Sequence, residues 1–384
     1  MAVRIALVGT RGVPARYGGF ETAVEEVGKR LAAAGHEVTV YCRRPRGSTE
    51  EELPATYLGM RLVVLPAVRS RAAETLTHTG LSVAHLCRAG TDAAFVFNAA
   101  NAPLLPLLRA ARIPVATHVD GLEWKRAKWS GLGRRYYRMA ESLAVRWSDA
   151  LIADAQGIAD YYRRSFGAPT VQIAYGAPVI DPGAARLGEL GLEPGGYHLV
   201  VARFEPENNV LPIVEGFRRS RAELPLVVVG SAPYAHAYTT AVHDAADGRV
   251  RFLGGVWDQD LLDQLYAGAA TYLHGHSVGG TNPSLLRAIG AGAPVIAFDV
   301  DFNREVVRSA GRYFTGPDDV AALVEEAEAD PDATAARGKA GLEEAARYDW
   351  DEVAEAYAEL AARLPAMRRE GKRPSGRRTR RGDA

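Results

Sequence analysis

Short runs of apolar, β-branched residues alternate along the chain with longer segments whose apolar residues recur every three or four positions. In the first half, the short runs predict strands at 3–8, 37–42, 60–65, 93–97, 115–118, 150–153 and 171–174. The longer segments predict helices at 22–34, 75–87, 103–111, 134–147 and 158–166. Because the strands are apolar throughout, the pattern predicts an α/β fold with a parallel sheet covered on both faces.

The alternation stops and then restarts. Residues 176–196 are rich in Gly and Pro and are predicted to form a hinge. The second half predicts strands at 199–201, 225–229, 250–253, 270–273 and 295–298. It predicts helices at 210–219, 234–245, 261–267, 284–290, 320–329 and 350–364.

The chain of 384 residues is too long for one ordinary core. We therefore expect domains at 1–175 and 197–345, then a helical segment at 346–365. Residues 366–384 are polar and basic and are predicted to be disordered.

A Gly-rich loop in the second half carries the strongest candidate chemistry. It follows the predicted strand 270–273 and leads directly into the helix 284–290. Asn282 can cap that helix and Pro283 suits its first position, so the remaining amides are expected to bind an anion such as a diphosphate. The loop residues assigned to this site are His276, Gly279, Gly280, Thr281 and Asn282.

A second loop of this kind, 9–22, follows the first predicted strand. Gly18 and Gly19 allow a ligand to approach the backbone, although a tight strand–helix turn explains them equally well. Glu21 can complement the dipole of the helix that follows.

Polar residues follow three further strands, at the sheet edge where ligands bind in open α/β folds. His118 and Asp120 are candidate catalytic groups, with a structural role as the alternative for the histidine. Arg203 can neutralise a diphosphate, and Asn208 or Asn209 is expected to cap the helix 210–219. Glu305 can accept hydrogen bonds from a sugar or ribose, or simply begin a solvated helix.

Composition narrows the class of protein. The formal charge is zero, so we expect no general affinity for nucleic acid, but residues 368–381 carry eight Lys/Arg and one acidic residue. Cys42 and Cys87 are expected to be buried thiols in a reducing cytosol. No apolar run has the length of a membrane-spanning helix, and the start of the chain lacks a signal-peptide layout.

Between Gly121 and Trp147, basic residues are interleaved with aromatic residues. This composition is compatible with sugar stacking, a phosphorylated acceptor, a lipid headgroup region, RNA or a plain solvated helix face.

These strings together resemble the two-domain GT-B glycosyltransferases of the retaining family 4, and in particular a bacterial rhamnosyltransferase-like branch. The resemblance rests on 9–22, 40–43, 120–126, 206–209, 274–286 and 303–306, and it extends over residues 3 to 360 in the same order. It implies two Rossmann-like, doubly wound domains facing a cleft, with the last helix crossing back onto the first domain.

The resemblance also implies roles for individual residues. The first domain takes the acceptor, with acceptor contacts at Glu123, Trp124, Lys125 and Arg126. The second domain takes the nucleotide sugar, with Arg203 as the diphosphate arginine and His118 beside the transferred sugar. Gly18 and Gly19 meet the donor phosphates.

The chain departs from the family pattern at three positions. The usual lysine near the diphosphate is Asn208, and the two usual glutamates are Gly279 and Arg287. A guanidinium cannot accept the ribose hydrogen bonds that a carboxylate accepts, so Arg287 is expected to weaken ribose binding or to turn toward the diphosphate.

The predicted function is retaining hexosyl transfer onto a glycan or lipid-linked acceptor in bacterial surface polysaccharide synthesis, with L-rhamnose from a dTDP donor as one candidate. No metal or other cofactor is expected, and the expected location is cytoplasmic, including the inner face of the plasma membrane. Two alternatives remain, namely a nucleotide- or glycan-binding relative without turnover and a GT-B nucleotide-sugar epimerase.

Overall fold

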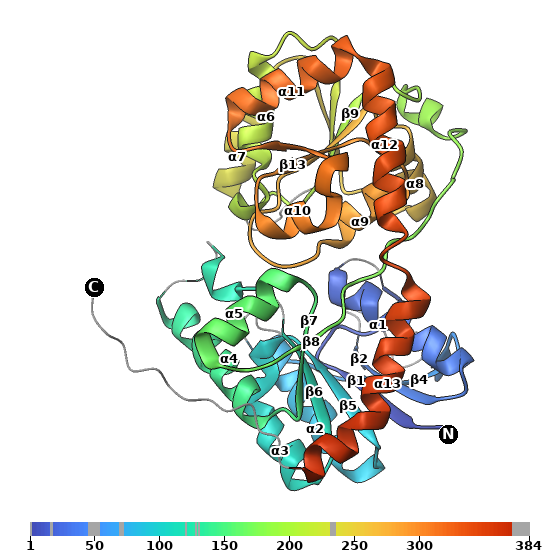
Figure 1. Cartoon of the computed structure of the whole chain (residues 1–384), viewed down its shortest axis with the longest axis vertical. Coiled ribbons are helices and arrows are strands. Elements are labelled where there is room, and N and C mark those ends of the chain that lie inside the picture. Colours follow the sequence, from blue (N-terminus) through green and yellow to red (C-terminus); the bar gives the residue numbers. More distant parts are fainter. Residues whose placement is uncertain are drawn as a thin grey trace. The chain divides into compact units, whose positions relative to one another are not determined.

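The computed structural model describes residues 2–15, 18–44, 54–68, 73–119, 121–126, 129, 131–230 and 236–370. The chain divides into two compact units (Figure 1). Unit 1 comprises residues 1–174 together with the C-terminal segment from Trp350 onward, and unit 2 comprises Tyr175–Asp349.

Unit 1 is built on an eight-stranded sheet in the order β3-β4-β2-β1-β5-β6-β7-β8, in which only β3 pairs antiparallel. Its strands are β1 Arg4–Val8, β2 Glu37–Arg43, β3 Thr56–Tyr57, β4 Met60–Leu65, β5 Ala93–Phe97, β6 Val115–Val119, β7 Ala150–Ala153 and β8 Val171–Gln172. The direction of winding reverses between β1 and β5, whose carboxyl ends therefore adjoin at a topological switch point.

The helices of unit 1 connect these strands. They are α1 Gly19–Ala33, α2 Glu74–Ala89, the 3-10 helix η1 Ala99–Leu104, α3 Leu105–Ala110, η2 Glu123–Lys125, α4 Gly131–Trp147 and α5 Gln156–Phe166. The long helix α13, Trp350–Arg369, also belongs to this unit and packs against α1 and β5.

Contacts along its whole length fix α13 in unit 1. The side chain of Tyr357 lies 5.0 Å from that of Phe95, measured between ring centroids, and Arg30 Nε is 2.5 Å from Asp351 Oδ1. Near its end, Arg368 Nη2 donates to the carbonyl oxygen of Arg109 at 2.7 Å. The prediction of disorder over 366–384 is thus wrong for residues 366–369, which are helical. Residues 371–384 lie outside the described part of the chain.

Unit 2 contains a six-stranded parallel sheet in the order β11-β10-β9-β12-β13-β14. Its strands are β9 His198–Val201, β10 Leu226–Val229, β11 Val250–Gly254, β12 Thr271–His274, β13 Val295–Phe298 and β14 Arg312–Phe314. Its helices are η3 Leu187–Leu190, η4 Pro206–Asn208, α6 Val210–Arg219, α7 His236–Ala245, α8 Gln259–Ala267, α9 Pro283–Gly290, α10 Asp301–Val307, η5 Arg308–Ala310, α11 Pro317–Ala329 and α12 Pro331–Ala345.

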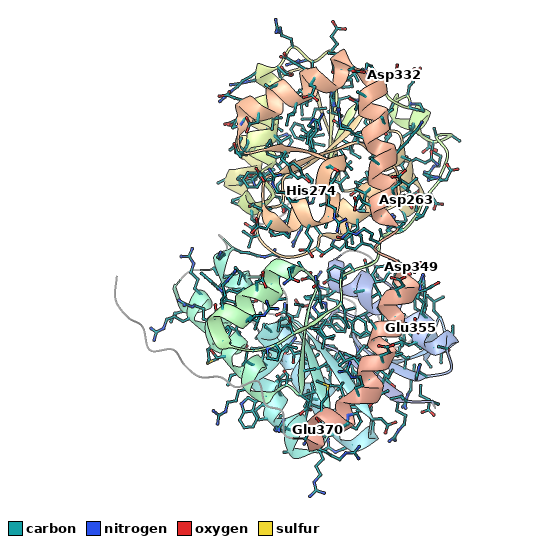
Figure 2. All side chains as sticks on the ribbon, in the orientation of Figure 1. Asp263, His274, Asp332, Asp349, Glu355 and Glu370 are labelled. Carbon is teal, nitrogen blue, oxygen red and sulfur yellow. The ribbon has the colours of Figure 1, made fainter. Side chains whose placement is uncertain are left out.

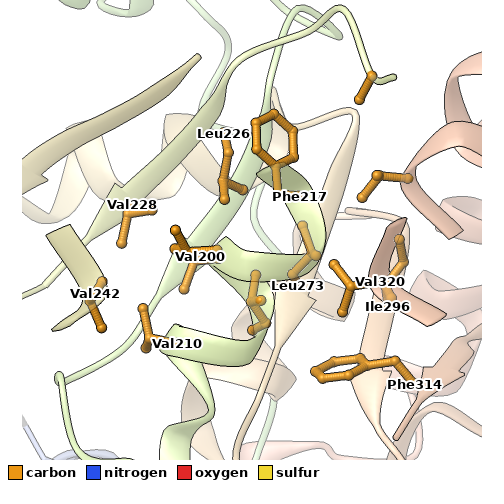
Figure 3. Packing of buried hydrophobic residues seen from close by; sticks show 14 of the residues in the cluster. Val200, Val210, Phe217, Leu226, Val228, Val242, Leu273, Ile296, Phe314 and Val320 are labelled. Atoms are coloured by element: carbon orange, nitrogen blue, oxygen red, sulfur yellow. The ribbon is translucent and has the colours of Figure 1, made fainter. Parts of the chain in front are cut away.

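The hydrophobic core of unit 2 explains why one face of its strands is apolar. On one side of the sheet, Val200, Leu226 and Leu273 pack against Phe217 of α6 and Val320 of α11, all at most 1% exposed (Figure 3). Burial of each large apolar side chain contributes about 1.5–3 kcal/mol, so this layer holds the strand ends in fixed positions.

The predicted fold class, two parallel-sheet α/β units, is confirmed. The sequence pattern missed β3, α12 and β14, and it indicated a helix at Glu305, now α10, only as an alternative. The segment expected to be a hinge contains η3. Cys42 is buried as expected, and burial raises the pKa of its thiol to about 11, but Cys87 is exposed, contrary to expectation. In the part of the chain that the structure describes, no helix is long and apolar enough to cross a membrane.

Candidate functional site

The topology of unit 2 brings two predicted site segments together. Strand β9 pairs with β12 in the centre of the sheet, and the order of the strands reverses between them. Arg203 follows β9 and the loop 275–282 follows β12, so both lie at the carboxyl edge of the sheet, at its switch point. This is the position where open α/β sheets bind their ligands.

The loop ends in the predicted helix cap. The Asn282 side-chain oxygen accepts a hydrogen bond from the Ser284 backbone N–H at 2.9 Å, and Pro283 is the first residue of α9. The Ser284 hydroxyl also donates to Asn282 at 2.8 Å and accepts from the Tyr272 hydroxyl at 3.1 Å. The start of α9 is therefore held to β12, with the positive end of its dipole at the loop.

A second set of hydrogen bonds joins the loop to the segment after β9. The Nδ1 atom of His276 lies 2.8 Å from the side-chain oxygen of Asn208, and Asn208 Nδ2 donates to the Arg203 carbonyl oxygen at 2.8 Å. Asn208 is 8% exposed. It therefore acts here as a brace between Arg203 and His276.

Asn208 or Asn209 is expected to cap α6, and Asn209 does occupy the cap position. Its side chain makes no cap hydrogen bond, however, and instead donates to the Gly275 carbonyl oxygen at 2.7 Å. A Cβ atom on Gly275 would lie 2.1 Å from the Asn208 carbonyl oxygen, so only glycine permits this approach of the loop to η4. The Ser277 hydroxyl completes the junction by donating to the Glu207 carbonyl oxygen at 2.9 Å.

The predicted charged residues of unit 2 have different environments. The Arg203 side chain is 52% exposed and is therefore accessible to an anion. Its Nη2 atom lies 3.6 Å from Glu205 Oε2. Arg287 forms an ion pair with Asp263 of α8, which the sequence did not anticipate. Glu305 lies in α10 and is partly buried.

Within the loop itself, Gly280 and Thr281 are buried and Gly279 has a positive φ of 148°. Two buried residues that sequence reasoning did not assign to the site support this region. Asn303 Nδ2 donates to the carbonyl oxygens of His276 and Phe298 at 3.0 and 2.9 Å. His274, inside unit 2 at the end of β12, lies with Nδ1 3.1 Å from the Tyr272 hydroxyl, and burial lowers its pKa to about 3 (Figure 2). The alternation in β12 places Tyr272 and His274 on one face of the strand and could have revealed this role.

In unit 1, Gly18 precedes α1 with a φ of 109°, and Gly19 is the first residue of that helix. The Glu21 carboxylate accepts a hydrogen bond from the Arg11 backbone N–H at 3.1 Å, and Glu25 accepts from that of Ala15 at 2.7 Å. These carboxylates fix the loop after β1, so Glu21 does more than complement the helix dipole.

The His118 side chain lies in an apolar environment near the carboxyl end of β6. Its ring stacks on Phe97 with 5.6 Å between centroids and meets the edge of Phe20 at 5.2 Å. Burial lowers the pKa of His118 to about 3, so the imidazole is neutral near pH 7. Asp120, its predicted partner, lies outside the described residues.

The segment predicted to contact an acceptor is folded onto itself. Glu123 Oε2 is 2.6 Å from Arg126 Nε, and Glu123 Oε1 accepts from Trp129 Nε1 at 3.3 Å. The Lys125 ammonium lies 5.7 Å from the Trp124 ring centroid. Glu123 is 8% exposed, which favours a structural role for its carboxylate.

Comparison with known proteins identifies both units. Residues 18–176 match the glycosyl transferase 4-like domain, and residues 196–329 match the glycosyl transferases group 1 domain. The chain carries both domains of a GT-B glycosyltransferase.

Two curated relatives from Mycobacterium tuberculosis match along almost the whole glycosyltransferase chain. A glycogen synthase is 26% identical over 93% of this chain and 94% of the relative. A GDP-mannose-dependent α-(1-6)-phosphatidylinositol monomannoside mannosyltransferase is 29% identical over 93% of this chain and 97% of the relative.

Solved structures share the fold. Sucrose-phosphate synthase from Thermosynechococcus elongatus superposes with a TM-score of 0.80 at 22% identity, over 94% of this chain and 99% of that one. HepE from Anabaena, solved with UDP-glucose, gives a TM-score of 0.75 at 16% identity over the same shares.

Proposed function

We propose that this GT-B protein is a retaining glycosyltransferase that binds the diphosphate of a nucleotide sugar at the loop 275–282 and Arg203. One observation carries the proposal: the switch point of unit 2 sets an accessible guanidinium and a capped, glycine-rich helix start at neighbouring strand ends. Both groups neutralise anions, one by charge and the other by backbone amides and the helix dipole.

In this proposal, Arg203 and the amides of Gly279, Gly280 and Thr281 stabilise the departing nucleoside diphosphate. Such preorganised donors act most strongly where charge develops in the transition state. A diphosphate oxygen takes the proton of the acceptor hydroxyl, so the proposed reaction needs no pair of catalytic carboxylates and no metal.

His118 is proposed to contact the transferred sugar. Its buried, neutral ring suits a hydrogen bond to a sugar hydroxyl and does not suit an acid that donates a proton at pH 7. Asp120 remains a proposed partner in this role. Glu123, Trp124, Lys125 and Arg126 remain proposed acceptor contacts, with the side chain of Glu123 supporting the others.

The donor is proposed to be a hexose on UDP, GDP or dTDP. Two observations on related proteins guide the choice: the mannosyltransferase relative is GDP-mannose-dependent, and HepE was solved with UDP-glucose. L-Rhamnose on dTDP, which only the resemblance to rhamnosyltransferases suggests, is a third donor to test. A glycan or lipid-linked acceptor in surface polysaccharide synthesis and a cytoplasmic location belong to the same proposal.

The test is to incubate purified protein with UDP-glucose, GDP-mannose or dTDP-rhamnose, with and without polyprenyl-diphosphate-linked glycan, and to measure nucleoside diphosphate release. Release that depends on the acceptor and yields a product with the donor's anomeric configuration supports the proposal. Inversion would refute retention.

A second function, nucleotide binding without turnover, is favoured by Arg287. This residue takes the place of the carboxylate expected for ribose binding, and it forms an ion pair with Asp263. A relative that binds nucleotides without turnover would show saturable nucleotide binding and no diphosphate release with any donor. An epimerase would release free sugar without an acceptor.

A further inference from the structure

Helix α4 of unit 1 exposes apolar side chains in a row. Leu132 is 80% exposed and Met139 is 47% exposed. Among the large apolar side chains that the structure describes, none is as exposed as Leu132. These two residues are seven positions apart, so they lie on the same side of the helix.

The same face of α4 is cationic. Arg135 and Arg146 fall on the stripe defined by Leu132 and Met139, and Arg138 lies beside it; all three arginines are exposed. The only acidic residue of α4 is Glu141, which is 4% exposed and accepts a hydrogen bond from the Tyr161 hydroxyl at 2.8 Å. The solvent-facing side of α4 therefore carries positive charge with no exposed carboxylate of its own to offset it.

The aromatic residues near α4 are partly buried and make contacts within unit 1. The Tyr136 hydroxyl donates to the Ala100 carbonyl oxygen at 2.6 Å, and Tyr137 packs on Trp129 with 4.9 Å between ring centroids. RNA recognition of single strands depends on accessible aromatic rings for stacking. The exposed groups here are aliphatic side chains between arginines, the composition of a helix that lies in a membrane interface.

We infer that the face of α4 formed by Leu132, Arg135, Met139 and Arg146 binds an anionic phospholipid surface. The arginines attract the lipid phosphates, and Leu132 and Met139 enter the region below the headgroups. The inference extends the proposed function, because α4 packs against η2, in the segment proposed to contact the acceptor, and a lipid-linked acceptor would be met at the same surface. Lipid binding itself requires no catalytic activity.

The experiment is co-sedimentation of the full chain with vesicles of phosphatidylcholine alone, or of an equal mixture of phosphatidylcholine and phosphatidylglycerol. We expect binding to the mixed vesicles only, and its loss at high salt. The double variant with Leu132→Ser and Met139→Ser should lower the partition coefficient at least tenfold. It lacks the two apolar side chains whose burial in the membrane interface favours binding. Arg135→Gln with Arg146→Gln should lower it by about fivefold per arginine.

Matched controls separate this face from other sources of affinity. Leu107→Ser changes an apolar side chain of α3 that is 52% exposed, and should leave binding unchanged. A full-length variant with Arg377, Arg378, Arg380 and Arg381 changed to Gln tests the basic tail.

The inference would be overturned if the protein did not bind the mixed vesicles at low salt, or if the α4 variants retained binding and the tail variant lost it. Affinity of α4 for RNA homopolymer without vesicle binding would also overturn it. Donor turnover is measured separately on a soluble acceptor, so failure of lipid binding is distinguishable from failure of the proposed transferase activity.

Discussion

The side-chain oxygen of Asn208 lies 2.8 Å from Nδ1 of His276, and this contact joins the residues after β9 to the loop after β12. Family 4 enzymes resembling this chain place a lysine at this position. Here Asn208 is buried, and its side-chain amide forms hydrogen bonds with both Arg203 and His276. Asn208 therefore shapes the site without adding charge.

We therefore predict that Asn208→Ala weakens nucleoside diphosphate binding although it removes no charge. Loss of the brace removes the hydrogen bonds that Asn208 makes with the buried His276 ring and with the Arg203 carbonyl oxygen, at a cost of about 1–3 kcal/mol. Calorimetric titration with UDP, GDP and dTDP measures the effect. Gln156→Ala, an exposed amide in unit 1, is the control, and equal affinities of Asn208→Ala and wild type would contradict the role of a brace.

The ion pair between Arg287 and Asp263 changes what is expected of Arg287→Glu. The substitution sets two carboxylates side by side between α8 and α9, so we expect a lower melting temperature and no gain in nucleotide affinity. Adding Asp263→Asn removes the repulsion, and affinity should then rise above that of the single variant. A double-mutant cycle on the affinities measures this coupling; additive effects would show that the pair does not control access to ribose.

Glu141 should make the stability of unit 1 depend on pH. Burial raises the pKa of this carboxyl to about 7, above its usual value, so the folded protein holds a proton that the unfolded chain releases. Stability is thus greatest at pH values below the unfolded pKa and falls as the pH rises through the folded one, by up to about 3 kcal/mol.

Glu141→Gln removes this dependence. The variant should be more stable than wild type at pH 8, and this advantage should shrink at pH 5. Melting temperatures of the two proteins at both values test this, and a constant difference between them would be inconsistent with a raised pKa.

Gly216 permits α6 to approach α11. A Cβ atom there would lie 2.3 Å from the Pro317 carbonyl oxygen and 2.7 Å from Val320 Cβ. Gly216→Ala should therefore destabilise unit 2 by about 1–3 kcal/mol through overpacking, despite the better helix propensity of alanine. Urea unfolding followed through hydrogen exchange in unit 2 gives the value. Gly248→Ala, where an added Cβ meets nothing within 4 Å, serves as the control.

The strands and the first turn of α9 could be predicted because their signals are local. Apolar runs such as 93–97 and 150–153 coincide with strands, and Asn282 with Pro283 marks the helix start. α12 was missed because its sequence, rich in Ala, Gly and charged residues, lacks a clear apolar stripe.

The contacts within the site could not be predicted from the sequence. The partners of Asn208 and Arg287 are 68 and 24 residues away along the chain, and they meet only through the order of the strands and helices. The amide of Asn209 likewise bonds the Gly275 carbonyl, 66 residues away, in place of the expected local cap.

The central claim is that Arg203 and the loop before α9 bind a nucleoside diphosphate. The most direct measurement is the calorimetric dissociation constant of UDP, GDP and dTDP for wild type, Arg203→Ala and the control Arg221→Ala, whose side chain is 91% exposed in the same unit. We predict that wild type and Arg221→Ala bind one of these nucleotides equally well, and that Arg203→Ala binds it roughly ten- to a hundredfold more weakly. Undiminished affinity in Arg203→Ala, or no binding of any of the three by wild type, would contradict the account.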